Sequence, residues 1–297
     1  MSGGHGHGHS AAGRHRWRLS LAAGIVATFF VVELVAGLMA RSLALISDAG
    51  HMAADVVTLG AALFATRVAI RPDTTGRRTF GSYRAEVFAS GFAVLVMLSV
   101  SAYIAIEAVA RFGSPVAPAT GVMLVVGALG LLVNLACMAL LRSGSRESLN
   151  VRGAYLEVLA DTLGSLGVIA AALLVRATGR TVWDTLIALA IATFVAVRAV
   201  LLGREVLAVL GQHAPAGITP EDMLAALSDL PGVSEVHDLH VWQLTSGMNV
   251  ATAHLVSDDR AGSNPLTAAS TLLRERFGIA HATLQVESAG TCQGADW

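Results

Sequence analysis

The chain contains six apolar stretches, each close to or above the ~20 residues that a helix needs to cross a lipid bilayer. Their approximate bounds are Leu19–Met39, Leu43–Val68, Ala85–Ala110, Val116–Leu141, Ala154–Ala177 and Val182–Leu202. Hydrophobic residues make up 54% of the 297 residues, charged residues make up 14%, and the mean hydropathy is +0.64. These values are typical of polytopic membrane proteins. We therefore predict an all-α membrane domain, a bundle of six transmembrane helices.

All 20 basic residues are arginines, and their distribution predicts an orientation. The N-terminal tail and the second and fourth connections hold Arg14, Arg16, Arg18, Arg67, Arg71, Arg77, Arg78, Arg84, Arg142, Arg146 and Arg152. The other connections hold Arg41, Arg111, Arg176 and Arg180. Because cytoplasmic loops carry the excess of basic residues, we expect both termini in the cytoplasm. The absence of Lys also excludes a Walker-type phosphate loop, and with it transport driven by the chain's own ATP hydrolysis.

Two pairs of ionisable residues interrupt the apolar stretches. His51 and Asp55 lie four residues apart in the second stretch, and Glu157 and Asp161 have the same spacing in the fifth. Residues four apart share one helix face, and a carboxylate within a membrane helix usually marks an ion path or a binding site. The two faces together predict a four-ligand metal site. The competing interpretation is a set of hydrogen bonds that only hold the bundle together.

After about Leu207 the composition changes to that of a small soluble domain. Thr219 can cap a helix that has Pro220 at its first position and ends at Pro231-Gly232. The following pattern predicts strands at Val233–Leu244, Met248–Val256 and Ala282–Glu287, with a helix at Pro265–Phe277 before the last strand. The order αββαβ predicts an α+β domain of about 80 residues, a size that often gains stability by forming oligomers.

Four motifs of the chain resemble those of the cation diffusion facilitators, which export divalent metals such as zinc from the cytoplasm. They are the segments Ser42–Asp55, Phe80–Glu86, Asn150–Ser165 and Val236–Trp242, and the resemblance extends from about Arg16 to Glu287. It implies a Y-shaped homodimer with six helices in each protomer and a ferredoxin-like, metallochaperone-like cytoplasmic domain. It also implies exchange of metal against protons by alternating access.

On this resemblance the chain divides into four parts. They are a His-rich cytoplasmic tail (1–16), the transmembrane domain (17–206), a cytoplasmic metal-binding and dimerisation domain (207–290) and a C-terminal tail (291–297). The expected partners are divalent metal ions, protons, membrane lipid and a second copy of the chain, and we expect no nucleic acid. Arg-only basicity with abundant Ala and Gly fits a GC-rich bacterium, so the expected location is the bacterial inner membrane.

The transport site of the family falls on His51, Asp55, Glu157 and Asp161, the residues that the spacing alone had suggested. Many zinc-selective members have His at the position of Glu157, so this site offers one imidazole and three carboxylates. Additional carboxylates make a metal site harder and less discriminating. We therefore expect zinc as the main substrate, with cobalt, cadmium, manganese and iron also accepted, and no organic cofactor.

Coupling to protons would follow from the same ligands, because they must lose their protons to hold a metal and can take them up once it leaves. The sequence therefore predicts that metal affinity falls as the pH drops. Two alternatives stay open: a membrane metal sensor without vectorial transport, and an exporter that prefers manganese or iron. An intramembrane metalloenzyme is not favoured, since no His-Glu-x-x-His motif is present.

Other polar and small residues in the apolar stretches suggest supporting roles. Asp48 is either an outer-shell partner or proton relay for the metal site, or a negative charge near a helix start. Glu33 and Glu107 are expected to support a polar network and Asn134 to bond between helices. Small residues such as Gly60 and Gly164 are predicted to let the second and fifth helices approach closely.

The soluble domain and the tails offer further ligands. From the resemblance, candidates for a cytoplasmic site are His237, His254, Glu287 and Cys292. Strand alternation places His240 on the face opposite His237, so we expect a structural role for His240 and for His281. The alternating His5, His7 and His9 of the N-terminal tail predict metal capture.

Overall fold

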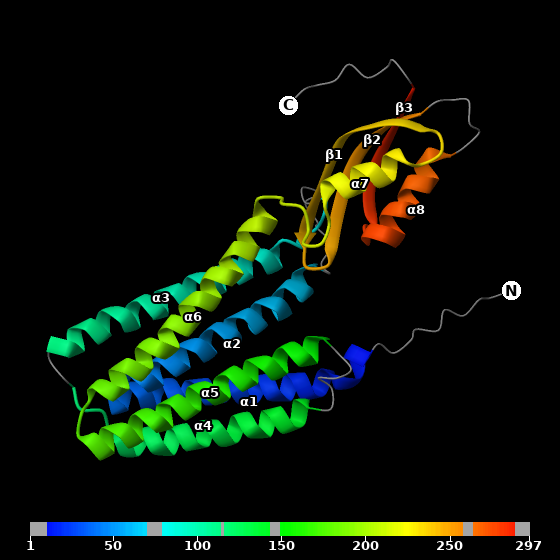
Figure 1. The fold of residues 1–297 in the computed structure, drawn as a ribbon. Coiled ribbons are helices and arrows are strands. Elements are labelled where there is room, and N and C mark those ends of the chain that lie inside the picture. The colour runs from blue at the N-terminus through cyan, green and yellow to red at the C-terminus, as the bar shows by residue number, and fades with distance from the viewer. Residues whose placement is uncertain (1–10, 70–78, 114–115, 143–148, 258–263, 289–297) are drawn as a thin grey trace. The chain divides into compact units, whose positions relative to one another are not determined.

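The structure is a computed structural model that describes residues 11–69, 79–113, 116–142, 149–257 and 264–288 (Figure 1). It divides into two compact units, one of Met1–Phe64 with Ala89–Gly203 and the other of Ala65–Phe88 with Arg204–Trp297. The histidines of the N-terminal tail and Cys292 lie outside the described residues.

Six long helices come first in the chain. They are α1 (Ala11–Ala40), α2 (Leu43–Ala69), α3 (Ala85–Gly113), α4 (Thr120–Leu141), α5 (Leu149–Thr178) and α6 (Val182–Leu210). Among the described residues, all of these except α2 are long and apolar enough to cross a membrane, which makes five such helices. The 27 residues of α2 include the ionisable Asp48, His51 and Asp55. The predicted helical membrane region is confirmed.

The helix α2 packs against two different groups of helices. One apolar cluster joins α2, through Leu45 and Met52, to Phe29 of α1, Met123 of α4 and Val168 of α5. A second cluster joins α2 to α3 and α6, with Leu43, Ile46, Ile104, Ala108, Ala188 and Ala192 as its buried members. Figure 1 shows α2 between α1, α4 and α5 on one side and α3 and α6 on the other. Both groups bury apolar surface against the same helix.

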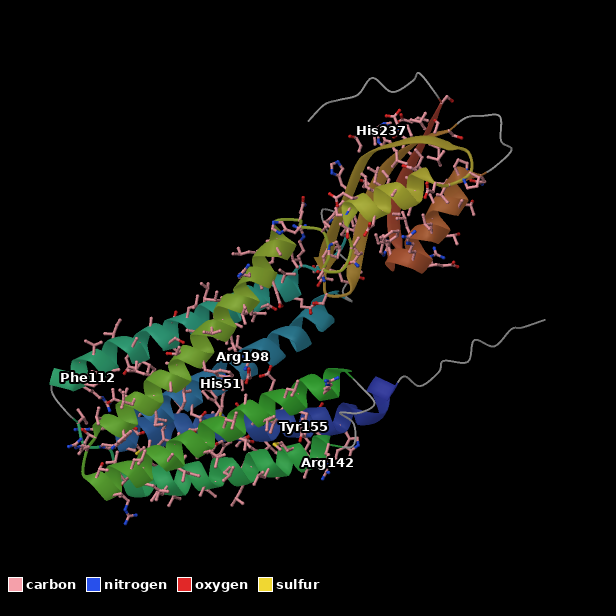
Figure 2. The ribbon with its side chains drawn as sticks, in the orientation of Figure 1. His51, Phe112, Arg142, Tyr155, Arg198 and His237 are labelled. Carbon is pink, nitrogen blue, oxygen red and sulfur yellow. The ribbon has the colours of Figure 1, made fainter. Side chains whose placement is uncertain are left out.

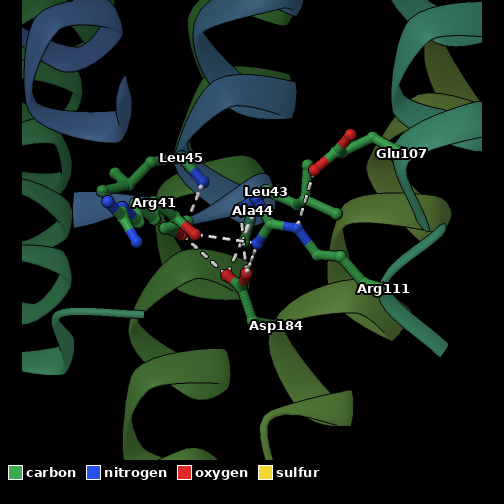
Figure 3. A network of polar contacts seen from close by, with 8 residues as sticks. Arg41, Leu43, Ala44, Leu45, Glu107, Arg111 and Asp184 are labelled. Atoms are coloured by element: carbon green, nitrogen blue, oxygen red, sulfur yellow. Dashed lines mark hydrogen bonds and ion pairs between the residues drawn. The ribbon is translucent and has the colours of Figure 1, made fainter. Parts of the chain in front are cut away.

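The first turn of α2 is capped by a carboxylate from α6 (Figure 3). Asp184 Oδ1 accepts hydrogen bonds from Ser42 Oγ at 2.7 Å and the Ala44 amide at 3.2 Å, and Asp184 Oδ2 accepts one from the Leu43 amide at 2.8 Å. These amides have no partner within the helix, and the negative charge also matches the positive end of the helix dipole. Asp48 lies beyond this turn, so the prediction that it serves the helix start is wrong and Asp184 has that role.

A guanidinium from α3 completes this network. Arg111 lies 3.6 Å from Asp184 Oδ2, donates a hydrogen bond of 2.8 Å to the carbonyl of Arg41, and donates one of 3.2 Å to Glu107. Glu107 therefore supports a polar network, as the sequence predicts. The result is that α3 and α6 both hold the beginning of α2.

The second unit has the predicted αββαβ order. Its elements are α7 (Pro220–Ser228), β1 (Val233–Thr245), β2 (Met248–Ser257), α8 (Pro265–Phe277) and β3 (His281–Ser288). The strands form one sheet in the order β1-β2-β3, with β1 and β2 antiparallel and β2 and β3 parallel. Its core contains Leu227 of α7, Leu255 of β2 and Leu273 of α8, so both helices pack on the same face of the sheet.

Two local predictions for this unit need correction. Thr219 is the N-cap residue of α7, but its side chain makes no capping hydrogen bond, and Pro220 at the first position needs no partner for an amide. The strand β1 is irregular, because its register with β2 shifts between His237 and His240 and Asp238 has a positive φ of 49°. His240 pairs with Thr252, two residues from His254, so the simple alternation that placed His240 opposite His237 does not hold.

Candidate metal centre

Three of the four predicted transport ligands meet between α2 and α5. Ligand atoms of His51, Asp55 and Asp161 all lie within 4.8 Å of one another, and His51 Nε2 is 3.6 Å from Asp161 Oδ1. The four-residue spacing puts His51 and Asp55 on one face of α2, and α5 supplies the carboxylate opposite them. One imidazole and two carboxylates around a common point form a donor set that suits a divalent transition metal.

Glu157, the fourth predicted ligand, is bound to an arginine. Its Oε1 accepts a hydrogen bond of 2.7 Å from the Nη2 group of Arg198 on α6, while its Oε2 is buried and has no hydrogen-bond partner among the described residues. Arg198 Nη1 also lies 3.5 Å from His51 Nε2. Figure 2 shows Arg198 beside His51 in the bundle. The site therefore contains a permanent cation in addition to its ligands.

A phenyl ring on α6 fixes the position of this arginine. Phe194 lies one helical turn before Arg198, with its ring centroid 6.0 Å from the guanidinium carbon. The same ring meets the His51 imidazole edge to face at a centroid distance of 5.8 Å. A cation–π contact and an edge-to-face contact between two rings are each modestly favourable. Helix α6 thus lines the site together with α2 and α5.

The sequence contained a signal for Arg198 that the spacing argument did not use. Arg198 lies inside the sixth apolar stretch. Placing an ionisable side chain in a membrane helix costs free energy there, just as it does for His51 and Asp55 in the second stretch. No second ionisable residue lies four positions away from it, so a search for spaced pairs passes over it. Only the structure places it against Glu157.

Exposure within the site changes along the helices. The side chains of His51 and Asp161 are 2% and 3% exposed, whereas those of Arg198 and Glu157 are 29% and 41% exposed. Glu157 lies one turn nearer to the beginning of α5 than Asp161 does. The ligands His51 and Asp161 are therefore enclosed by the helices, and the side chains are less enclosed toward the end of the bundle where α5 begins.

Asp48 and Glu33 lie behind the ligands. Asp48 is 1% exposed and Glu33 of α1 is fully buried, and their carboxyl groups interact with each other and with that of Asp161. Neither belongs to the group of ligand atoms within 4.8 Å of one another. The outer-shell role predicted for Asp48 stays a prediction, and this position suits it.

Small and polar residues between the helices behave as predicted in part. A Cβ atom at Gly164 of α5 would collide with the Asp48 carboxylate, so glycine allows α5 and α2 to approach there. At Gly60 no atom of the described residues lies within 4 Å of such a Cβ, so the described part of the chain gives no support to its predicted packing role. Asn134 of α4 donates a hydrogen bond of 3.4 Å to Ser165 of α5, as expected of a residue that joins helices.

Gly164→Ala is expected to lower both thermal stability and metal affinity, because the added methyl group must displace Asp48 or separate α5 from α2. Overpacking of this kind costs about 1–3 kcal/mol. The control is Gly153→Ala in the same helix, where no atom of the described residues lies within 4 Å of an added Cβ. Thermal unfolding and metal titration of both variants in detergent measure the effect. Indistinguishable behaviour of the two variants would refute the packing role.

A second group of candidate ligands lies on the sheet. His254 Nδ1 is 2.9 Å from Glu287 Oε1, His237 Nε2 is 3.6 Å from Glu287 Oε2, and ligand atoms of all three residues lie within 4.8 Å of one another. On β2 the buried Ala253 and Leu255 face the helices, so alternation puts His254 on the other face. Asp238, at the irregular position of β1, has a carboxylate oxygen 3.8 Å from His254 Nδ1 and was not predicted.

The chain matches two family models that together cover most of its length. Residues 19–210 match the family model described as the cation efflux transmembrane domain, and residues 215–289 match the one described as the cation efflux protein, cytoplasmic domain. The chain is 42% identical to the metal cation efflux system protein CzcD of Cupriavidus metallidurans, over 99% of this chain and 93% of that protein.

Two further relatives and one solved structure are also similar. The zinc transporter ZitB of Escherichia coli is 35% identical over 94% of this chain and 89% of its own length. The cadmium, cobalt and zinc/H(+)-K(+) antiporter of Bacillus subtilis is 34% identical over 89% and 86%. The metal-bound C-terminal domain of CzcD from Cupriavidus metallidurans is 35% identical, with 24% of this chain and 99% of that chain covered and a TM-score of 0.22. The chain belongs to the cation diffusion facilitator family, whose members are membrane transporters for the efflux of divalent metal cations and not enzymes.

Proposed function

We propose that this chain exports zinc, and also cobalt and cadmium, in exchange for protons by alternating access through the site between α2 and α5. The observation that carries the proposal is the meeting of His51, Asp55 and Asp161 from two helices inside the helical bundle, next to an apolar cluster. The names of the relatives, which include zinc, cadmium and cobalt, support the choice of metals. The name of the Bacillus subtilis relative also supports the exchange with protons.

The donor set explains how one site can serve both ions. An imidazole and carboxylates bind a divalent metal only in their deprotonated forms. Once the metal has left, the carboxylates are near one another in a buried place, where several negative charges are costly. Uptake of protons removes that cost. The same atoms therefore bind metal on one side of the membrane and protons on the other.

The test combines binding and transport. Zinc affinity of the full-length protein in detergent is expected to fall as the pH is lowered from about 7.5 to about 5.5, a range that includes the usual imidazole pKa of about 6.5. In proteoliposomes, an imposed proton gradient is expected to drive zinc, cobalt and cadmium flux. Affinity that stays constant with pH would contradict the exchange. Metal binding without flux would favour the alternative of a membrane metal sensor. Faster flux of manganese or iron than of zinc would favour the alternative of a manganese or iron exporter.

The topology completes the proposal. We place both termini in the cytoplasm of a bacterial cell, because the N-terminal tail and the second and fourth connections are rich in Arg, and cytoplasmic loops carry the excess of basic residues. The described site would then open toward the cytoplasm, because its more exposed residues, Glu157 and Arg198, lie nearest to the end where α5 begins. This is the direction from which an exporter must load. We further propose a homodimer, in keeping with the family's cytoplasmic domain.

The sheet site is proposed to bind metal on the cytoplasmic side. His237, His254 and Glu287 offer two imidazoles and one carboxylate, and Cys292 is proposed as a further ligand. His254→Ala in the full-length protein is expected to remove one class of zinc sites in a titration while the intramembrane class remains. His281→Ala, a change at an exposed His of the same sheet, is the control. An unchanged number of zinc ions bound by His254→Ala would refute this site.

A further inference from the structure

We propose that Arg198 is a competing internal cation: it binds Glu157 while the transport site is empty and gives up that carboxylate when a metal ion binds. The inference rests on the proposed function, since it assigns to Arg198 control over how many carboxylates the site offers to the metal. Arg198 would be a positioning residue that acts through Glu157.

The geometry of Glu157 supports this competition. One of its carboxylate oxygens accepts a charge-assisted hydrogen bond of 2.7 Å from Arg198, and the other is buried without a hydrogen-bond partner among the described residues. The carboxylate is near enough to Asp55 and Asp161 to interact with both. It is therefore held at the edge of the ligand group, with one oxygen taken by the arginine and one still able to accept a bond.

The position of Arg198 makes it more than a surface partner of Glu157. Its guanidinium lies 3.5 Å from His51 Nε2 in the empty site and also against the Phe194 ring, and the contact with Phe194 can keep it beside the ligands when the ion pair opens. A divalent metal bound to His51 and the guanidinium bound to Glu157 repel each other. Both also bind the Glu157 carboxylate. Binding of one must weaken binding of the other, and linkage makes this effect reciprocal.

Charge balance explains why such a cation suits this chain. With all ligands deprotonated, Asp55, Asp161 and Glu157 carry three negative charges, and a divalent metal supplies two positive ones. Arg198 supplies the third, so these three carboxylates, the arginine and the metal are together neutral, with the buried Asp48 and Glu33 behind them counted in their protonated, uncharged forms. A charge buried without a counter-charge is costly. The positive charge on α6 therefore matches the additional carboxylate on α5.

The experiment is a double-mutant cycle of zinc affinity, measured by calorimetry on the full-length protein in detergent. The variants are Arg198→Gln, Glu157→Gln and the double variant. Arg198→Gln is expected to tighten zinc binding on the order of tenfold, within the usual range for coupled binding events. In the Glu157→Gln background the same change is expected to give a clearly smaller gain, because only the direct repulsion between arginine and metal is left to remove. Arg204→Gln, which removes an exposed charge from the same helix, is expected to match the wild type.

Any other result would overturn the inference. An equal gain in both backgrounds would mean that Arg198 only repels the metal, and no gain or weaker binding would mean that it is structural. Arg198→Met, which keeps an aliphatic stem against Phe194, replaces the Gln variant if that one does not fold. Asp161→Asn separates this inference from the site itself. Zinc affinity unchanged by Asp161→Asn would end both proposals, whereas loss of binding there with no response to Arg198→Gln would end only this one.

Discussion

Asp161→Asn is expected to abolish metal flux driven by a proton gradient. Asp161 is 2% exposed and is the carboxylate of α5 that meets both ligands of α2. The amide has nearly the shape of the carboxylate, but it has no negative charge and cannot take up or release the exchanged proton. Loss of an outer-shell partner already costs about 10–100-fold in metal affinity, so loss of a direct ligand should cost more than about 100-fold.

The measurement is zinc uptake into proteoliposomes of defined internal pH, with wild-type protein and the variant reconstituted at equal density. Asp222→Asn makes the same chemical change at an exposed position of α7 and is the control. Zinc binding measured on the same preparations separates loss of binding from loss of movement. Wild-type flux in Asp161→Asn would show that metal crosses the membrane by another route.

Asp184→Ala is expected to give the largest loss of stability among single substitutions in the helical bundle. Asp184 is 1% exposed and accepts three hydrogen bonds, one from Ser42 Oγ and two from amides of the first turn of α2, and the Arg111 guanidinium lies beside it. Alanine would leave Arg111, whose side chain is 10% exposed, without its closest buried counter-charge. Removing one partner of a buried ion pair typically costs about 3–5 kcal/mol.

Thermal unfolding of the full-length protein in detergent measures this loss. Asp184→Asn is the matched variant, because its amide oxygen can still accept from Ser42 or from an amide of α2 although the negative charge is gone. We expect its unfolding temperature to lie between those of wild type and Asp184→Ala. An unfolding temperature of Asp184→Ala equal to that of the wild type would show that the cap contributes little to stability.

Periodic and local features were predictable from the sequence. The six apolar stretches became helices because length and apolarity act over a continuous segment, and the spacing of His51 and Asp55 put them on one face by helix geometry alone. The αββαβ order could be predicted as well. Asn264 and Gly278, the residues at the two ends of α8, follow standard capping preferences.

What could not be predicted depends on partners distant in the chain. Ser42 and Asp184 are 142 residues apart, and no local pattern indicates that an α6 carboxylate caps α2. The ion pair of Glu157 with Arg198 spans 41 residues and two helices. The register shift in β1 arises from pairing with β2, and it changed the expected face of His240. All three features depend on tertiary contacts between segments that are distant in the sequence.

The double packing of α2 has a mechanical consequence. This helix carries His51 and Asp55, shares one apolar cluster with α1, α4 and α5, and shares another with α3 and α6. Its beginning is also tied to α3 and α6 by Arg111 and Asp184. Packed interiors shift as blocks rather than deforming smoothly. If metal binding at the proposed site draws α2 toward Asp161 of α5, we expect α3 and α6 to move with α2, so that a change at a few atoms would displace half of the bundle.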